Sequence, residues 1–501
     1  MLKGKTVILG VTGSIAAYKA VDIASQLTQA GARVDVIMTE AATEFVTPLT
    51  FQAITGRAVT SDMFELPSDF SIDHISLAEA ADVIVIAPAT ANIIAKLAAG
   101  MADDILCCTV LASKSPVLIA PAMDTNMFEN PITQDNLSNL KARNFITVGP
   151  ASGRLASGKE GLGRLADIND ITGTICQVLG RGGDLAHKNI VVTAGGTQEP
   201  IDPVRCITNR SLGKMGYALA EAARDRGARV TLITAPASLA MPVGIEIVNV
   251  GTAQEMYQAV RDVALQADVL IMAAAVADYR PVSAAKDKIK KKGVGLTLEL
   301  EPTPDILGSV QGDFIKVGFA AESSNLVENA KQKLQQKGLD LIVANDISSF
   351  GADSSQVTLI DRDGKVENLP LLTKREVADK ILDKVVDLLA KKTIKPEDIV
   401  EIPIKKGHID RAYLFIPAPQ FRKGLLPSAG SIQLVTEANI FDATIYVFPS
   451  RKEHATIELH NGEKFREWYE RLGIVAGDKA AIKVIEPMTK YHLEILKKRK
   501  T

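Results

Sequence analysis

The sequence contains few cysteines and almost no net charge. Four of its 501 residues are cysteines, none in a CxxC spacing, and the adjacent Cys107 and Cys108 cannot easily form a disulfide with each other. We therefore expect a reduced protein of the cytoplasm. The 57 basic and 59 acidic side chains leave a formal net charge of -2, which excludes a global electrostatic attraction to nucleic acid or to an anionic membrane. An anionic ligand must therefore be held by local groups.

Long apolar runs are also absent. The first apolar segment, in MLKGKTVILGVTGSIAAYK, is interrupted by glycine and threonine, so it indicates a strand entering a turn and not a signal peptide. No run of roughly 18 apolar residues predicts a membrane span. What the chain does have is 47% hydrophobic residues, which is enough for two or three ordinary cores. We expect several domains.

Two segments begin in the same way, KTVILGVTGS at 5–14 and KNIVVTAGGT at 188–197. Each is a β-branched run that ends in glycine and threonine, which predicts a strand, a glycine turn and a helix. The further expected helices cover 16–30, 91–99 and 213–227, and the expected strands cover 33–38, 82–87, 116–120, 229–234 and 268–273, with two more near Lys316 and Leu341. This alternation predicts an α/β fold with two doubly wound, parallel, Rossmann-like sheets, joined by the glycine-rich linker at 179–187.

The last hundred residues have a different pattern. Short β runs at 412–416, 444–448 and 481–484 lie between Pro, Gly and Asn turns, which predicts a small β-rich domain over 395–501. This segment has 18 Lys/Arg and 14 Asp/Glu, a net charge of +4, partly from the KKRK tail at 497–500. We favour a packing or assembly module with a solvated tail, and a DNA-binding pseudobarrel is the alternative.

Five motifs in the first part of the chain occur in a fixed order. The first is the turn GVTGSIAAYK at 10–19, which places backbone N–H groups at a helix N-terminus, where they favour an anion. It is followed by DHIS at 73–76, PATANIIAKLAAGMADD at 88–104, PAMDTNM at 121–127 and SGRLASGKEGLGRL at 152–165. Glycine turns alone are often only tight connections. Together, however, the five motifs resemble the flavin-dependent cysteine decarboxylases, in particular the phosphopantothenoylcysteine decarboxylases, over residues 1–180.

This resemblance implies a flavodoxin-like domain that binds FMN. The FMN residues that it implies are Gly13, Ser14, Ile15, Thr39, Thr90 and Asn92. The catalytic histidine of the family falls on His74, and imidazole suits this work because it changes protonation near neutral pH while it steers the substrate. Without the motif context, a lone histidine after an aspartate would be an ordinary surface or capping residue.

Two positions depart from the family pattern. Asp124 stands where the family usually has an asparagine that contacts the substrate carboxylate, and Ser157 stands where the flap usually carries a cysteine. Two facing carboxylates repel each other, but loss of CO2 removes that repulsion, so an aspartate is chemically tolerable. A serine hydroxyl is a much weaker acid than a thiol. We hypothesise that Asp124 takes over proton delivery in a variant decarboxylase; the alternative is a decayed site.

A second set of motifs follows the second glycine turn. It comprises ITNRSLGKMG at 207–216, AAAVADYRP at 273–281, DKIKKKG at 287–293, PTPDIL at 302–307, GFAAE at 318–322 and KLQQKGLDLIVAND at 333–346. The set is similar to the phosphopantothenate–cysteine ligases over residues 186–392. The nucleotide residues of that family fall on Ala273, Ala274, Ala275, Asp278, Lys288, Pro304, Asp305, Ile306, Leu307, Phe319, Lys333 and Lys337. Outside this context, the basic run around Lys288 would indicate only a solvated surface.

The ligase chemistry explains these residue types. Activation of a carboxylate by a nucleotide brings two anions together, so lysines such as Lys288 and backbone N–H groups must neutralise them, usually with Mg2+. Asn209 matches the residue that the ligase family uses in the acyl-cytidylate step. A neutral amide suits this step, since it can orient the intermediate without repelling it. Asp278 can accept a hydrogen bond from a cytosine amino group, which fits the CTP preference that the resemblance implies. The sequence does not indicate the metal ligands.

The two resemblances together imply a bifunctional enzyme of coenzyme A biosynthesis. Its substrates would be 4'-phosphopantothenate, cysteine and CTP, and the ligase product, 4'-phosphopantothenoylcysteine, would be the decarboxylase substrate. The resemblance also implies a homo-oligomer, with FMN sites between decarboxylase subunits and with ligase domains paired as dimers. The alternative is a ligase whose first domain is only a flavin-binding scaffold.

Overall fold

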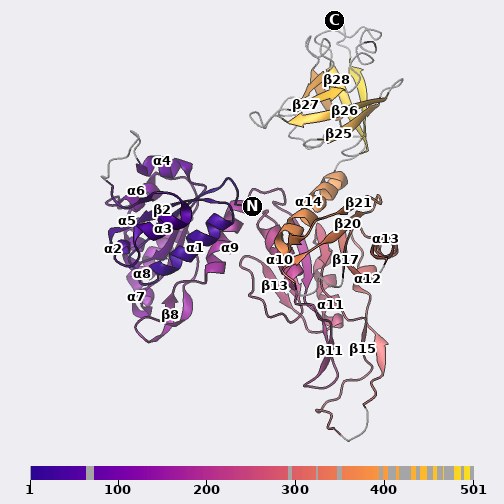
Figure 1. The fold of residues 1–501 in the computed structure, drawn as a ribbon, viewed down its shortest axis with the longest axis horizontal. Helices are drawn as coiled ribbons and strands as arrows, with labels where there is room; N and C mark the ends of the chain where they lie inside the picture. The colour runs from indigo at the N-terminus through magenta and orange to yellow at the C-terminus, as the bar shows by residue number, and fades with distance from the viewer. Residues whose placement is uncertain are drawn as a thin grey trace. The chain divides into compact units, whose positions relative to one another are not determined.

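A computed structural model describes residues 2–63, 73–291, 296–322, 325–346 and 352–393, together with Glu467 and seven strands between 399 and 496. By its internal contacts the chain divides into a unit over Met1–Leu382 and a unit over Asp383–Thr501. The first unit contains two α/β sheets, and the second contains a β sheet (Figure 1). No described helix combines the length and the apolar character that crossing a membrane requires.

The first sheet is parallel throughout, with the strand order β3-β2-β1-β4-β5-β6. Its strands are β1 (Thr6–Val11), β2 (Arg33–Met38), β3 (Val59–Thr60), β4 (Val83–Ala89), β5 (Val117–Pro121) and β6 (Ile146–Thr147). Without the two-residue β3, this is the flavodoxin-like order 2-1-3-4-5, so the predicted fold of this part is confirmed.

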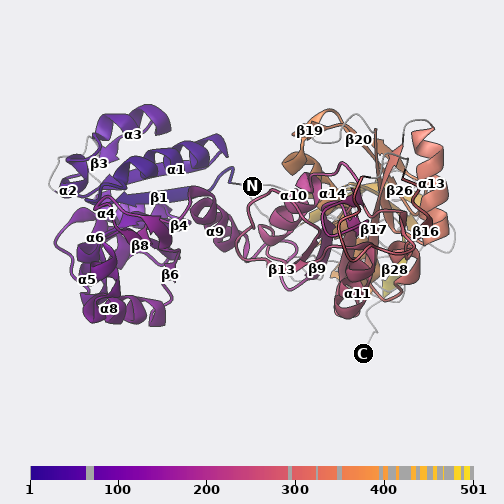
Figure 2. The same cartoon turned by 90° about the horizontal axis from the view of Figure 1, so that it is seen from below.

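Helices cover both faces of this sheet (Figure 2). Side chains alternate between the faces along each strand, so Val7 and Leu9 of β1 belong to one apolar cluster and Ile8 to the other. The first cluster contains residues of α1 (Ala17–Gln29), α3 (Pro48–Thr55) and α9 (Ile168–Gly180), and the second contains residues of α5 (Ala91–Ala99), α6 (Ile105–Ala112) and α8 (Pro131–Ala142). The remaining elements are α2 (Glu40–Thr43), α4 (Asp73–Ala80), α7 (Thr125–Glu129), and the hairpin of β7 (Ala151–Arg154) and β8 (Glu160–Arg164).

The second sheet has the order β13-β12-β9-β14-β17-β18-β20-β21. Its strands are β9 (Asn189–Ala194), β12 (Arg229–Thr234), β13 (Glu246–Asn249), β14 (Val269–Met272), β17 (Ile315–Glu322), β18 (Leu341–Asp346), β20 (Val357–Asp361) and β21 (Val366–Asn368). The first six are parallel, as the predicted doubly wound sheet requires, and two antiparallel strands that the sequence did not predict, β20 and β21, extend its edge. The chain between β18 and β20 is shorter than the dozen or so residues that a helical crossover needs, and it must return antiparallel.

The second sheet is flanked by α10 (Lys214–Arg224), α11 (Ala253–Ala264), α12 (Ile306–Ser309), α13 (Leu326–Lys337) and α14 (Lys374–Thr393). Three short ladders pair β10 (Gln198–Pro200) with β11 (Cys206–Thr208), β15 (Tyr279–Pro281) with β16 (Leu300–Pro302), and β19 (Ser354–Ser355) with β22 (Leu372–Thr373).

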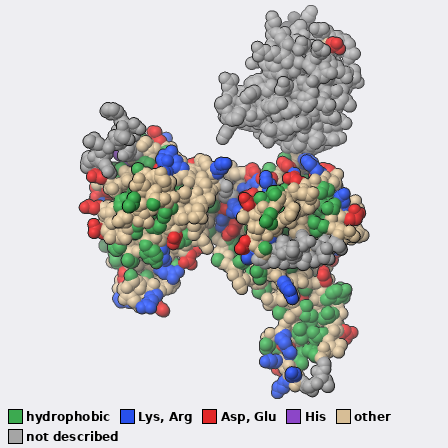
Figure 3. All heavy atoms as spheres, in the orientation of Figure 1, with side chains coloured by type: hydrophobic (Ala, Val, Ile, Leu, Met, Phe, Trp, Pro, Cys, Tyr) green, Lys and Arg blue, Asp and Glu red, His purple; other side chains and the backbone are tan. Residues whose placement is uncertain are grey.

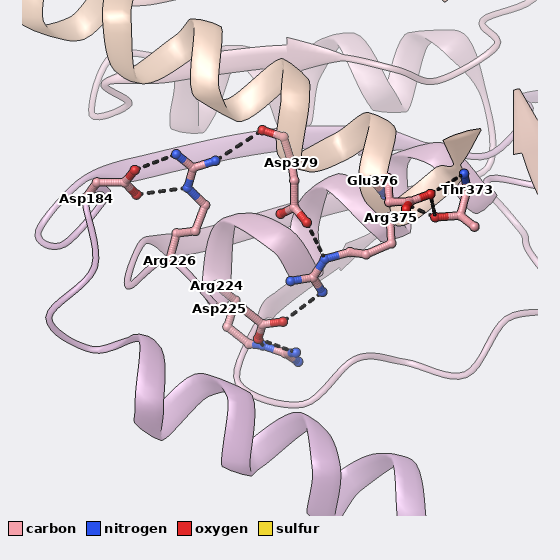
Figure 4. Close-up of polar contacts among 8 residues, drawn as sticks. All are labelled: Asp184, Arg224, Asp225, Arg226, Thr373, Arg375, Glu376 and Asp379. Atoms are coloured by element: carbon pink, nitrogen blue, oxygen red, sulfur yellow. Dashed lines mark hydrogen bonds and ion pairs between the residues drawn. The ribbon is translucent and has the colours of Figure 1, made fainter. Parts of the chain in front are cut away.

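Polar contacts join the start of α14 to the end of α10 (Figure 4). Arg375 donates to the buried carboxylate of Asp225 over 2.8 Å, and Arg226 donates to the carbonyl of Asp379 over 3.2 Å. The first turn of α14 is thereby fixed.

The last described strands form one seven-stranded sheet in the order β23-β28-β29-β25-β26-β27-β24. They are β23 (Ile399–Pro403), β24 (Tyr413–Ile416), β25 (Gly430–Val435), β26 (Ile440–Val447), β27 (Ala455–Leu459), β28 (Lys479–Glu486) and β29 (Lys490–Leu496). All of its pairs are antiparallel except β25 with β29. The prediction of a β-rich last domain is confirmed, and the KKRK tail lies outside the described residues.

Candidate active sites

Both α/β sheets have a point at which the strand order reverses. In the first sheet β1 lies between β2 and β4, and in the second sheet β9 lies between β12 and β14. Ligands of doubly wound sheets bind beyond the carboxyl ends of the strands at such a reversal. The glycine turns after β1 and β9 begin there, as do the segments after β4 and β14. A cavity lies at each of these points.

The first cavity has a volume of about 1080 Å³. Its lining includes every residue that the sequence predicted for FMN, namely Gly13, Ser14, Ile15, Thr39, Thr90 and Asn92. It also includes Asp124 and Ser157, which are 33 positions apart in the sequence. The sheet topology therefore brings the turn, the segment after β4, the segment after β5 and the flap to one place.

The turn between β1 and α1 permits close approach by a ligand. A Cβ atom on Gly13 would lie 2.5 Å from the Cβ of Ala41, so a larger residue does not fit. The N-cap residue of α1 is Ala16, which has no side chain to cap the first turn. The hydroxyl of Thr39 is buried and has no hydrogen-bond partner among the described residues. An uncapped helix N-terminus and an unpartnered hydroxyl suit a ligand that carries a phosphate.

The flap is the β7–β8 hairpin, and Ser157 lies in its turn. The amide of Met123 donates to the carbonyl of Gly163 over 2.9 Å, which ties the flap to the PAMDTNM segment. A Cβ atom on Gly163 would lie 2.2 Å from the carbonyl oxygen of Met123, so glycine is required for this approach. Asp124 is the N-cap of α7, and its carboxylate accepts hydrogen bonds from the amide of Asn126 at 3.0 Å and from the hydroxyl of Ser157 at 3.3 Å.

A cluster of charged residues that the sequence did not single out forms another part of the same wall. Lys96 pairs with Asp103 at 2.9 Å and with Asp104 at 3.0 Å, and these hydrogen bonds raise the pKa of the lysine. Burial alone would raise the pKa of Asp104, but hydrogen bonds from the Cys107 amide and from Lys96 hold it below its usual value. Asp103, Asp104 and Cys107 have the spacing of metal donors, but Lys96 already occupies both carboxylates.

His74 is not among the residues that line this cavity. It is half-buried in the first turn of α4, and this helix packs against α6. The hydroxyl of Ser113 donates to the carbonyl of Ala78 and helps to fix that packing. Within this chain, His74 is therefore outside the cavity lining that contains Asp124 and Ser157.

The second cavity has a volume of about 630 Å³. Its lining includes Asn209 and nearly all the residues predicted for the nucleotide, namely Ala273, Ala274, Ala275, Asp278, Pro304, Asp305, Ile306, Leu307, Phe319, Lys333 and Lys337. The segment after β14 is held against the segment after β9, because the Ala275 amide donates to the Gly195 carbonyl over 2.8 Å. The side-chain amide of Asn209 donates to the carbonyls of Ala275 and Val276.

Two predicted lysines of this cavity already have protein partners. Lys333 donates to the carbonyl of Phe319 over 2.8 Å, and Lys337 forms an ion pair with Asp305. Burial alone would raise the pKa of Asp305, but hydrogen bonds from Lys337 and from the Gly308 amide hold it below its usual value. These pairs order the wall formed by α12 and α13.

Lys288 is exposed and lies outside the lining of the cavity. The next residue is firmly held, because the Ile289 amide donates to Asp202 over 3.1 Å and its carbonyl accepts from Arg205 over 2.8 Å. The lysine therefore projects from a fixed base beside β10 and β11. The cavity is also lined by Lys214, Ser355 and Lys374, which were not predicted from the sequence. Only the GKMG motif pointed to one of them, Lys214.

Comparison with known proteins gives two family matches. Residues 1–180 match the flavoprotein family, and residues 185–389 match the family described as the C-terminal domain of DNA/pantothenate metabolism flavoproteins. Proteins named coenzyme A biosynthesis bifunctional protein CoaBC are similar over most of the chain. The one from Bacillus subtilis is 46% identical over 398 residues, which is 77% of this chain and 98% of the relative. The one from Vibrio parahaemolyticus is 43% identical and covers 77% of this chain and 99% of the relative.

Solved structures also match parts of the chain. The crystal structure of the C-terminal domain of a CoaBC protein is 43% identical, with a TM-score of 0.37, and the match covers 41% of this chain and 98% of that domain. The crystal structure of the FMN-dependent cysteine decarboxylase SpaF is 32% identical, with a TM-score of 0.32, and the match covers 36% of this chain and 97% of that protein.

Proposed function

The chain belongs to the family of bifunctional coenzyme A biosynthesis proteins, and on that premise we propose that it catalyses two consecutive reactions. The second domain, over 186–392, couples 4'-phosphopantothenate to cysteine in a CTP-dependent reaction. The first domain, over 1–180, decarboxylates the product, 4'-phosphopantothenoylcysteine, to 4'-phosphopantetheine with FMN. The observation that carries this proposal is that each sheet has a cavity at its reversal point, lined by the motif residues of the corresponding reaction.

FMN is proposed to bind in the first cavity with its phosphate at the N-terminus of α1. Gly13, Ser14 and Ile15 would surround the phosphate, Thr39 would donate its otherwise unpartnered hydroxyl, and Asn92 would contact the flavin. Bound FMN supplies a reversible two-electron oxidation of the substrate. The protein contributes the positioning of the substrate carboxylate and the movement of protons.

Asp124 and Ser157 are the proposed proton-handling groups on the cavity wall. A substrate carboxylate bound beside Asp124 would be repelled by it, and this repulsion would favour the loss of CO2. The hydrogen bond from Ser157 keeps the Asp124 carboxylate oriented on the flap side. His74 would steer the substrate. We propose that a second copy of the chain supplies this histidine, because His74 does not line the cavity of the chain to which it belongs.

The ligase reaction is proposed to proceed in two displacements. A carboxylate oxygen of 4'-phosphopantothenate attacks the α-phosphorus of CTP, the bond from that phosphorus to the bridging oxygen breaks, and pyrophosphate leaves. The amine of cysteine then attacks the acyl carbon, the carbon–oxygen bond to CMP breaks, and the amine loses a proton. Asn209 would orient the acyl-cytidylate, and Lys288 would stabilise negative charge in the first displacement.

Mg2+ is proposed to enter together with the nucleotide. Among the described residues, the cavity of the second domain contains no convergent set of three metal-donor side chains. Such a site suits a Mg2+ ion whose ligands are mostly phosphate oxygens and water. No step of the proposed reaction is assigned to particular metal ligands.

A homo-oligomer is part of the proposal. Hydrophobic side chains are exposed along the arm that contains β15 and β16, including Tyr279, Val282, Leu296, Leu298 and Leu300 (Figure 3). An apolar surface of this kind favours pairing with a second copy.

The four cysteines are free, which supports the proposed reducing compartment, the cytoplasm.

Two assays on the purified full chain test the two halves separately. Incubation with 4'-phosphopantothenoylcysteine under anaerobic conditions is expected to release CO2, and incubation with 4'-phosphopantothenate, CTP and cysteine is expected to release CMP. Release of CMP without CO2 would replace the decarboxylase by a flavin-binding scaffold. Failure to release CMP would reject the ligase.

A further inference from the structure

One end of the second cavity contains three polar side chains outside the predicted nucleotide set: Lys214, Ser355 and Lys374. They come from three segments that are far apart in the sequence. Lys214 is the first residue of α10, Ser355 ends β19, and Lys374 is the first residue of α14. The same cavity is lined by the segments 273–275 and 304–307 that were predicted to surround the cytidine. It therefore combines the predicted nucleoside residues with a separate group of two lysines and a serine.

Short-range contacts bring these three segments together. The β19–β22 ladder pairs Ser355 with Leu372, immediately before the start of α14. The Lys374 amide donates to the carbonyl of Asp353 over 3.0 Å. The carboxylate of the same aspartate accepts from the ammonium of Lys214 over 2.6 Å. Asp353 thus joins the start of α10 to the start of α14.

The hydroxyl of Ser355 is an unpartnered polar group in this wall. The residue is 1% exposed, and its Oγ has no hydrogen-bond partner within the part of the chain that the structure describes. A buried hydroxyl without a partner is unfavourable in a protein interior, so each such group needs an explanation. A ligand oxygen in the cavity would provide the missing hydrogen bond.

The charges at this end favour an anion. Lys374 is half-buried, and no described residue forms a hydrogen bond or ion pair with its ammonium group. Burial and the neighbouring charge of Lys214 lower the pKa of Lys374, although Asp353 opposes them. The side chain of Asp353 is 90% exposed, so water screens its charge more than it screens the lysine charges. The N-terminus of α10 adds its positive dipole, and it has no side-chain cap.

The position of Lys374 is fixed on both sides. Thr373 and Glu376 form reciprocal hydrogen bonds that cap α14, and Arg375 is tied to Asp225 (Figure 4). Lys374 therefore begins a helix whose first turn is anchored before any ligand arrives. Preorganised cations of this kind stabilise developing negative charge without a large rearrangement.

We propose that Lys214, Ser355 and Lys374 form a subsite for the β- and γ-phosphates of the nucleoside triphosphate and hold the pyrophosphate as it leaves. The inference rests on the proposed ligase function. In the first displacement, the electron pair of the breaking phosphorus–oxygen bond passes to the bridging oxygen of pyrophosphate, so negative charge increases at this end of the cavity. Lys333 and Lys337 are paired with Phe319 and Asp305, and Lys214 is paired with Asp353. Among the lysines of this cavity, Lys374 is therefore the one whose ammonium group has no partner within the described residues.

The test is a comparison of CTP with CMP, which lacks these two phosphates. Their dissociation constants are measured by calorimetry for the full chain and for Lys374→Gln, Ser355→Ala and Lys374→Arg. Lys374→Gln is expected to weaken CTP by about tenfold or more, as expected for loss of a charged hydrogen bond, and to leave CMP unchanged. Ser355→Ala is expected to weaken CTP by a smaller factor, and Lys374→Arg to retain most of the affinity. Inorganic pyrophosphate should follow the pattern of CTP.

The matched control is Lys380→Gln, which removes the same charge from an exposed position of α14 outside the cavity. The melting temperature of each ligand-free variant shows whether it is folded. The melting temperature of Lys374→Gln should not fall, because this substitution removes the repulsion between Lys374 and Lys214. Equal weakening of CTP and CMP, or no change in CTP, would overturn the subsite. So would an increase in the KM of phosphopantothenate alone, which would assign the lysines to that substrate. If the unmodified chain binds no CTP, the proposed function falls as well.

Discussion

The hydroxyl of Ser157 donates a hydrogen bond to the Asp124 carboxylate over 3.3 Å. These are the two positions at which the chain departs from the decarboxylase pattern. Their contact across the flap supports the hypothesis that the two departures belong together, because the carboxylate replaces an amide at the same point where a hydroxyl replaces a thiol. The pair lines the cavity proposed for FMN.

Substitution of Asp124 by asparagine is expected to slow proton delivery while the fold is retained. Asp124→Asn should still cap α7, because the amide oxygen can accept from Asn126 as the carboxylate does. If Asp124 delivers the proton, anaerobic release of product should slow by about 10²- to 10⁴-fold. Ser157→Ala should slow it less, because the hydroxyl only orients the carboxylate. Flavin content is the control for an intact cavity, and unchanged rates in both variants would refute the role of Asp124.

Gly13→Ala is expected to impair FMN binding. The new Cβ would lie 2.5 Å from that of Ala41, so the turn must move, at a cost of about 1–3 kcal/mol. The flavin absorbance per chain after gel filtration should fall. Gly182→Ala is the matched control, because its Cβ would meet no atom within 4 Å. Equal flavin content in both variants would show that the turn does not contact FMN.

Lys288→Gln tests the lysine that lies outside the cavity lining. The side chain is exposed, so the fold and the melting temperature should be retained. Release of CMP from 4'-phosphopantothenate, CTP and cysteine is expected to fall by about 10²- to 10³-fold if this lysine stabilises charge in the transition state. Lys290→Gln, an exposed neighbour in the same segment, should keep the normal rate. Turnover unchanged by Lys288→Gln would reject the assignment.

The pairing of Asp104 with Lys96 should make stability depend on pH. The folded state lowers the pKa of Asp104, so this carboxylate stabilises the fold above its ordinary pKa of about 3.9 and loses that contribution as the pH falls through the lower, folded-state pKa. Asp104→Ala also removes the cap of α6 and should cost about 1–2 kcal/mol at pH 7. Urea unfolding at pH 7 and at pH 3 measures the difference.

Asp104→Asn separates the two effects, since asparagine still caps a helix but carries no charge. Its deficit relative to the unmodified chain should be present at pH 7 and should shrink in acid. A deficit of constant size across this range would mean that the charge of Asp104 does not stabilise the fold.

The sequence was sufficient to predict the features that depend on local sequence pattern, namely the strands and the glycine turns that follow them. The β-branched runs before the glycine turns became β1 and β9, and the residues after β1, β4, β9 and β14 gathered in the two cavities as the motifs implied. Topology alone brings these segments together, because the carboxyl ends of parallel strands share one edge. The antiparallel β20 and β21 were missed, since their direction depends on the length of a connection and not on strand composition.

Other features depend on distant contacts and could not be predicted. Ser355 and Lys374 reach the cavity through the β19–β22 ladder, whose strands have only two residues each and give no periodic signal. His74 and Lys288 belong to recognisable motifs, but neither lines the two cavities described above, and sequence spacing does not indicate which copy a side chain serves. Motif order thus located the sites, and tertiary structure decided which side chains meet there.

Helix α14 begins in the first unit and continues past Leu382 into the second. Val385 and Leu389, which follow that division, are both buried. Shortening the chain at the division would therefore cut α14 in two and remove both buried side chains, whereas shortening it after Thr393 would leave the helix whole. A chain shortened to isolate the ligase from the β-rich unit should therefore end beyond the last turn of α14.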